Sequence, residues 1–349
     1  RGSTFTTIEE QNPLRTNDQW FRPVHCAVGP DGSIYVADFY DARITHVDPR
    51  DNWDRSNGRI HRIRASDSKT SKPPDLGKLS STQLVDKLLE KNQWARRHAR
   101  RLLRTRSAEP SLDELGRIVK EYNPDNDRSE QQALEALWIL QGTSLPKTNP
   151  SEMKEILLAA LGSSSPDLQR WAIRIAADHG TPLGPALVEI ASGTKHAEVI
   201  SQLASAARIL GDRSLIEALA RRGEFSADPF IPLQLWWALE SLISHHPVQA
   251  RELLSYSEFW DTPLFESILS ERVGRRYMAE RSPESLKMCA QLLTRAKGSK
   301  HLGSLIRGMV RALEGTSLDP VPPELDAALA YLWKNGDVSG EVIQLSLRL

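Results

Sequence analysis

The sequence has little cysteine, no net charge and no long hydrophobic run, and each absence excludes a class of protein. Cys26 and Cys289 are its only cysteines, which excludes a disulfide framework, a four-cysteine zinc site and a C-x-x-C-H haem-attachment motif within this chain. No apolar run approaches the roughly 18 residues of a membrane-spanning helix. The 45 Lys and Arg residues balance 45 Asp and Glu residues, so we expect no general nucleic-acid-binding function, and any charged site must be local.

Short catalytic and nucleotide-binding motifs are also missing. The sequence has no P-loop, no G-x-G-x-x-G and no G-x-S-x-G. We therefore expect no metal site and no cofactor within this chain. The chain starts at Arg1 rather than Met and has no basic-then-apolar signal segment, so we interpret it as a fragment of a longer protein.

The N-terminal region, residues 1–65, has the pattern of short β-strands. Apolar residues alternate over Val24–Val28, and the pattern resumes at Ile34–Val36 after the turn sequence Gly-Pro-Asp-Gly. Gly58–Ile63 predicts a third strand, and Thr4–Ile8 predicts a fourth. Such a small antiparallel sheet cannot bury both faces by itself, so it needs neighbouring sheets or a helical layer.

The rest of the chain has the pattern of helical repeats. Residues 66–76 are rich in Ser, Lys and Pro and predict a linker, and from residue 77 to 349 the hydrophobic period is 3.6. Helix starts are indicated at Ser80, Ser111, Asn149 and Ser282. Similar Ala-containing segments recur at intervals of about 30 to 40 residues, which is typical of paired-helix repeats: NQWARRHARRLL, SEQQALEALWIL, DLQRWAIRIAADHG, QLASAARILGD and PLQLWWALESL. The sequence therefore predicts a mainly α fold, a HEAT- or armadillo-like solenoid preceded by a small antiparallel sheet.

Four stretches carry a resemblance to a known family. WFRPVHCAVGPDGSIYVADFYDARITHV and NWDRSNGRIHRI resemble the last propeller blade of large proteins classed as membrane-bound dehydrogenases in planctomycetes and verrucomicrobia, and RWAIRIAADHG and DPFIPLQLWWALESL resemble their helical repeats. In that family a propeller similar to quinoprotein sugar dehydrogenases precedes the repeats, and a cytochrome c domain usually follows them. The resemblance implies a periplasmic location and partner domains on both sides, an upstream propeller and a downstream cytochrome c. It also implies quinone and haem c in the longer protein.

Candidate site residues gather near the ends of the predicted strands. Asp38 and His46 are the first candidates for a catalytic or ligand site, because propellers open their central channel at strand ends. The alternative is that Asp residues here stabilise turns through hydrogen bonds to the backbone. Arg59 and Arg62 could clamp an anion, or they could pair with the nearby aspartates of the NWDRSNGR loop, which begins at Asn52, and hold the blade together.

A run of arginines in residues 93–106 predicts a basic ridge along one helix. Five of them fall on adjacent stripes of that helix: Arg96, Arg97, Arg100, Arg101 and Arg104. The ridge is either a solvated, salt-bridged surface or a patch for phosphate or an acidic partner. Trp171, Trp236, Trp237 and Cys289 lie in apolar helical faces, and we expect them in the core.

These observations leave three hypotheses for function. The first is a non-catalytic helical-repeat scaffold that positions partner domains, since no nucleophile, metal or cofactor motif is present. The second is a part of a quinone-dependent sugar or alcohol dehydrogenase whose propeller contributes to the active site. The third is a stand-alone HEAT-type adaptor that binds other proteins.

Overall fold

The computed structural model describes residues 2–8, 12, 14–42, 47, 49–50, 53–67, 72, 74–106, 109–126 and 128–349. Within this part the chain is mainly helical, with a small antiparallel sheet near the N-terminus, which confirms the predicted fold class. The chain has two compact units. The first is Thr6–Trp171, and the second is Ala172–Leu349 together with the N-terminal residues to Phe5.

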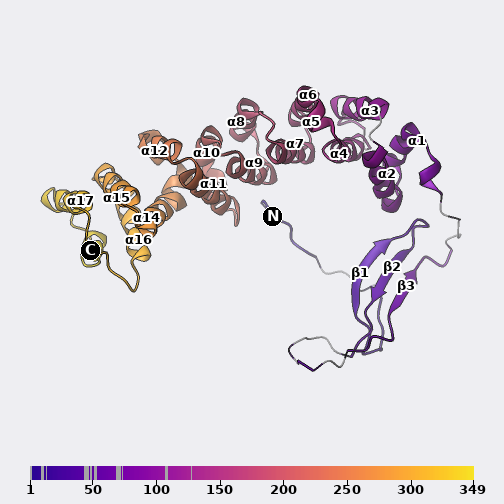
Figure 1. Cartoon of the computed structure of the whole chain (residues 1–349), viewed down its shortest axis with the longest axis horizontal. Helices are drawn as coiled ribbons and strands as arrows, with labels where there is room; N and C mark the ends of the chain where they lie inside the picture. The colour runs from indigo at the N-terminus through magenta and orange to yellow at the C-terminus, as the bar shows by residue number, and fades with distance from the viewer. Residues whose placement is uncertain are drawn as a thin grey trace. The chain divides into compact units, whose positions relative to one another are not determined.

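The sheet has three strands among the described residues. These are β1 (Pro23–Val28), β2 (Ile34–Asp38) and β3 (Arg59–Ile63), with β2 in the middle (Figure 1). The predicted turn joins β1 to β2: Gly29 N donates to Ser33 O at 2.8 Å, and Gly32 has a φ of 78°, in the left-handed region that favours glycine. Turn chemistry and alternation therefore set the register of this hairpin.

The prediction of a fourth strand at Thr4–Ile8 is wrong. Phe5 and Ile8 are 89% and 84% exposed, so neither side chain packs on a sheet. Ser3 instead donates from its backbone N–H to the carboxylate of Asp228 at 2.9 Å, in the second unit. A pattern of five residues does not distinguish a strand from an extended segment that a polar contact holds at one end.

The helices of the first unit form two rows. The helices are α1 (Ser81–Asp86), α2 (Gln93–Arg106), α3 (Glu109–Lys120), α4 (Ser129–Leu140), α5 (Leu145–Thr148) and α6 (Pro150–Leu161), and α7 (Pro166–His179) crosses into the second unit. α1, α3 and α6 are neighbours in one row, and α2 and α4 in the other. Ser80 and Gln83 form a capping box at α1, and Asn149 caps α6, as predicted. α3 begins at Glu109, two residues before the predicted start, because Pro110 is tolerated in a first helical turn.

The second unit continues the alternation of helices. Its helices are α8 (Gly184–Gly193), α9 (Ala197–Leu210), α10 (Arg213–Ala220), α11 (Ile231–His245), α12 (Pro247–Ser255), α13 (Ser257–Trp260), α14 (Ser270–Glu280), α15 (Pro283–Ala296), α16 (Leu302–Ala312), α17 (Pro323–Lys334) and α18 (Gly340–Ser346). α8, α10 and α12 neighbour one another in one row, and α9 and α11 in the other (Figure 1). Beyond them α15 packs on α17, and α14 packs on α16. This arrangement is typical of helical repeats.

The core of each unit follows the predicted apolar faces. Ala99, Ala136 and Ala207 are fully buried where neighbouring helices approach. Trp236 and Cys289 are buried as predicted, whereas Trp237 is 43% exposed. Adjacent positions on a helix lie about 100° apart, so one member of a Trp pair in a surface helix turns outward. No helix in the described ranges is long and apolar enough to cross a bilayer.

Candidate functional site

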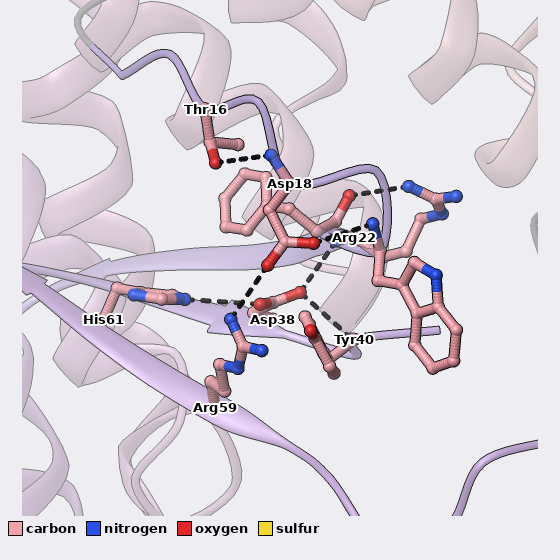
Figure 2. Close-up of polar contacts among 9 residues, drawn as sticks. Thr16, Asp18, Arg22, Asp38, Tyr40, Arg59 and His61 are labelled. Atoms are coloured by element: carbon pink, nitrogen blue, oxygen red, sulfur yellow. Dashed lines mark hydrogen bonds and ion pairs between the residues drawn. The ribbon is translucent and has the colours of Figure 1, made fainter. Parts of the chain in front are cut away.

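Asp38, at the end of β2, is the centre of a polar cluster (Figure 2). Its side chain is buried. One carboxylate oxygen, Oδ1, accepts hydrogen bonds from Arg22 N at 2.7 Å and from Tyr40 N at 3.0 Å, and the other, Oδ2, lies 3.2 Å from Nε2 of His61. The carboxylate thus joins the segment before β1, the end of β2 and the middle of β3.

These contacts determine the charge of Asp38. Burial raises the pKa of this carboxyl, but the hydrogen bonds from Arg22 N, His61 and Tyr40 N together outweigh burial and hold the pKa below its usual value. Asp38 is therefore ionised at neutral pH. An ionised carboxylate that already accepts three hydrogen bonds is a poor general base, so the geometry favours an anchoring role.

An ion pair between Arg59 and Asp18 lies beside the Asp38 cluster. Arg59 lies 3.1 Å from Asp18, and its guanidinium lies 3.3 Å from the centroid of the Tyr40 ring (Figure 2). Trp20 packs on the same tyrosine, with ring centroids 5.7 Å apart. Arg59 thus has an acidic partner, as one sequence hypothesis expects, but the partner is Asp18 and not an aspartate of the Asn52–Arg55 segment.

The other polar residues considered in the sheet region pair with residues other than Asp38 or lie outside the described residues. Arg62 pairs with Asp31 of the hairpin turn, again a different aspartate from those expected. Asp54 accepts hydrogen bonds from Ser56 and Asn57, which lower its pKa to about 2, as in a turn-stabilising aspartate. His46 lies outside the described residues.

An open pocket of about 600 Å³ lies beside the cluster. It is lined by residues at the ends of β2 and β3 and around Trp53: Val24, Ala37, Asp38, Phe39, Trp53, Asp54, Arg55, Asn57 and Gly58. Most of its exposed lining is apolar. A space of this volume has room for a small molecule.

The predicted arginine ridge lies on α2, and two of its members pair with one buried acid. Glu135 of α4 is 3% exposed and accepts a hydrogen bond from Arg100 at 2.7 Å. Arg96 lies 3.7 Å from the same carboxylate. The sequence carries a signal for such a buried pair, an acidic residue inside the apolar segment SEQQALEALWIL, but Glu135 was not among the predicted site residues.

Four members of the ridge, Arg100 among them, surround a pocket. Arg97, Arg100, Arg101 and Arg104 line a space of about 410 Å³ together with Thr105 and Gly142. We call this space the arginine pocket. It brings together four of the five predicted ridge residues, whereas Arg96 turns toward the carbonyl oxygens of Glu90 and Lys91.

A larger groove of about 720 Å³ lies among α12, α15 and α17. Its floor is apolar and includes Leu254, Met288 and Leu292, and its lining includes the cations Arg251, Lys287 and Arg295 and the acid Glu324. We call this space the α15 groove. No sequence motif marks it, because its residues come from three helices.

Comparison with known families identifies one region. Residues 1–67 match a domain of unknown function, DUF7133. The match covers the sheet and ends before the first helix. A comparison with curated proteins found no match. Within the described residues, no group of three or more His, Cys, Asp or Glu side chains is arranged to hold a metal ion.

Proposed function

We propose that this chain is a non-catalytic interaction region, in which the sheet packs against the sheets of a propeller-type domain and the helical repeats position partner domains. The observation that carries this proposal is the exposure of apolar side chains on the sheet. Ile60 and Val24 are 75% and 67% exposed, and Ile34 is 41% exposed.

These residues lie on both faces of the sheet. Ile34 is the register partner of Ile63, whereas Ile60 is the register partner of Ala37. Ile34 and Ala37 are three residues apart on β2, so their side chains lie on opposite faces of the sheet. A three-stranded sheet that leaves apolar side chains exposed on both faces is a poor unit by itself, and another sheet on each face is the usual way to cover them. In a propeller, each blade has a neighbouring blade on either side, and these neighbours cover both of its faces.

The finer identity rests on the family resemblance of the blade and repeat motifs. It supports a place in a periplasmic, haem-linked dehydrogenase of the planctomycete and verrucomicrobial type, with quinone and haem c held by the partner domains. The proposal requires GPDG-type blade sequences upstream in the same reading frame and a C-x-x-C-H motif downstream.

The test measures binding between this chain and the polypeptide encoded upstream, produced separately. We expect a complex by isothermal titration calorimetry, and we expect Ile60→Asp to abolish it, because a charge buried at the interface would have no partner there. The matched control is Val248→Asp on α12, a residue that is 57% exposed in the helical part. Undiminished binding of Ile60→Asp, or a reading frame without upstream blades, contradicts the proposal.

The pocket beside Asp38 favours a second function, a direct part in a quinone-dependent sugar or alcohol dehydrogenase. Trp53 at this pocket would stack on a sugar ring, and Asp38 would hold the pocket wall in place. In this case Trp53→Ala in the longer protein lowers kcat/KM for the sugar or alcohol. Under the scaffold proposal the same variant leaves kcat/KM unchanged, so the two functions are distinguished.

The α15 groove favours a third function, a stand-alone adaptor. Three cations against one acid around an apolar floor suit an amphipathic helix with acidic flanks. Met288→Glu, on the floor, would then abolish binding of an acidic amphipathic peptide. Ile60→Asp would leave that binding intact.

A further inference from the structure

The arginine pocket on α2 concentrates four guanidinium groups within two helical turns, and we propose that it binds a phosphate or diphosphate group of a small ligand. Its lining side chains are Arg97, Arg100, Arg101, Arg104 and Thr105, and the backbone of Gly142 closes one side. This site is independent of the sheet surface in the proposed function.

Two of the four guanidinium groups at the pocket have no carboxylate partner among the described residues. Arg100 has the carboxylate of Glu135 at 2.7 Å. Across the described ranges, neither Arg97 nor Arg101 has a carboxylate within ion-pair distance, and the partner of Arg101 is the imidazole of His98 at 3.3 Å. Burial, and then the charge of Arg101, lower the pKa of His98. This imidazole is therefore neutral and does not offset the positive charge of the arginines.

Several other surface arginines of this chain, though not all, are paired with acids. Arg213 lies 2.8 Å from Glu252, Arg276 lies 2.7 Å from Glu280, and Arg307 lies 3.1 Å from Glu341. In a chain with equal numbers of acidic and basic residues, an excess of positive charge around one pocket is a local feature. Like charges this close repel one another, and a bound anion relieves that repulsion.

Two of the guanidinium groups are held in place by the protein. Arg100 is fixed by Glu135 and lies 5.1 Å from the centroid of the Trp138 ring. The guanidinium of Arg104 occupies the space that the missing side chain of Gly142 leaves, since a Cβ there would collide with it. Planar guanidinium forks match phosphate oxygens in bidentate geometry, so a pair of fixed groups and a pair of exposed ones form a suitable cradle.

The size of the pocket favours a small ligand over a macromolecule. A volume of about 410 Å³ is that of a small-molecule site. The cations that line it come from a single helix, α2, whereas a nucleic-acid track needs a basic stripe that continues over several elements.

The experiment is isothermal titration calorimetry of the full chain with inorganic pyrophosphate as the probe, and with inorganic phosphate and citrate as comparisons. We expect saturable binding of pyrophosphate at one site, weaker binding of phosphate, and an affinity that falls as salt rises. Arg97→Gln combined with Arg101→Gln should weaken pyrophosphate binding by about tenfold or more, because each removes charged hydrogen-bond donors.

A second variant tests the geometry without a change of charge. Gly142→Ala should displace Arg104 and weaken binding, while the helical circular dichroism stays the same. The matched control is Arg117→Gln combined with Lys120→Gln, which removes two cations from α3 in the same unit. Absence of saturable pyrophosphate binding, citrate binding as tight as pyrophosphate, or an equal loss in the control pair overturns the proposal.

Discussion

Gly308 on α16 packs its backbone directly against Glu271 on α14. A Cβ on Gly308 would collide with the carbonyl oxygen of Glu271 and would lie 2.8 Å from Arg275 N. The contact is reciprocal, since a Cβ on Gly274 of α14 would collide with the carbonyl group of Leu305 on α16. The two helices therefore cross so closely that neither position has room for a side chain.

We predict that Gly308→Ala destabilises the second unit. The groups in its way are backbone atoms, which cannot move aside as a flexible side chain can, so we expect a loss of about 2 to 3 kcal/mol in the free energy of unfolding. The control is Gly193→Ala at the end of α8, where a Cβ meets nothing within 4 Å. Urea unfolding followed by circular dichroism measures both, and an equal midpoint for the two variants would contradict the close crossing.

The sequence indicates the helices well because apolar periodicity and capping residues are local signals. The segment SEQQALEALWIL coincides with α4, and Ser80, Asn149 and Ser282 cap the helices that they are predicted to start. The crossing at Gly308 could not be predicted, because a glycine in a sequence does not show which backbone lies opposite. The prediction of a fourth strand is wrong for a similar reason, since a pattern over five residues does not show whether a partner strand is present.

The sequence predicts which charged residues belong to the candidate site, but it does not predict which residues they pair with. Asp38 stands out because it ends a strand, and Arg59 and Arg62 stand out because they flank the apolar residues of another. Their acidic partners depend on which strands pair and in which register, so Asp18 was not expected. Arg22 gave no signal, because it contacts Asp38 through its backbone N–H, which nearly every residue has.

We predict that Asp38 makes the sheet sensitive to acid. Its pKa in the folded chain lies below the usual 3.8, so its stabilising contribution is complete above that pH and is lost as the pH falls through the lower folded value. Nuclear magnetic resonance should show the amide signals of Arg22 and Tyr40 moving together in that acid range. In Asp38→Asn this shared transition should be absent, and a persistent transition would assign the titration to another group.

We predict that the two cysteines differ in reactivity. Cys26 is exposed on β1, whereas Cys289 is buried in α15, where burial raises the pKa of its thiol to about 12. A thiol-specific reagent at pH 8 should modify one thiol in the folded chain and two in denaturant, because only the thiolate reacts. Cys26→Ser should leave no reactive thiol until the chain unfolds; rapid labelling of this variant would show that α15 opens readily.

We predict that the sheet depends on the rest of the chain. Residues 1–65 on their own should show no cooperative thermal melt, because three short strands with exposed apolar side chains bury too little surface. A chain that starts at Pro74 should keep its helical circular dichroism, since neighbouring helices bury one another. A cooperative melt of residues 1–65 would show that the sheet is self-sufficient.

We predict that Asn92 holds the hairpin turn against the first helices. Its Nδ2 donates to the carbonyl oxygens of Gly29 at 3.1 Å and Pro30 at 3.0 Å, and its Oδ1 accepts from Trp94 N at 2.8 Å as the cap of α2. Asn92→Asp keeps an acceptor for the cap but removes both donors and places a negative charge against two carbonyl oxygens, so the turn should lose about 1 to 2 kcal/mol.

Hydrogen exchange separates these two roles of Asn92. In Asn92→Asp the amides of β1 and β2 should exchange about tenfold faster, which corresponds to that free-energy loss, while the amides of α2 keep their protection. The matched control is Asn123→Asp, because the Asn123 side chain accepts only from Asp125 N, two residues along the chain. Because the control leaves the hairpin untouched, faster exchange of β1 and β2 in both variants would mean that added charge, and not the lost contact at Gly29 and Pro30, loosens the sheet.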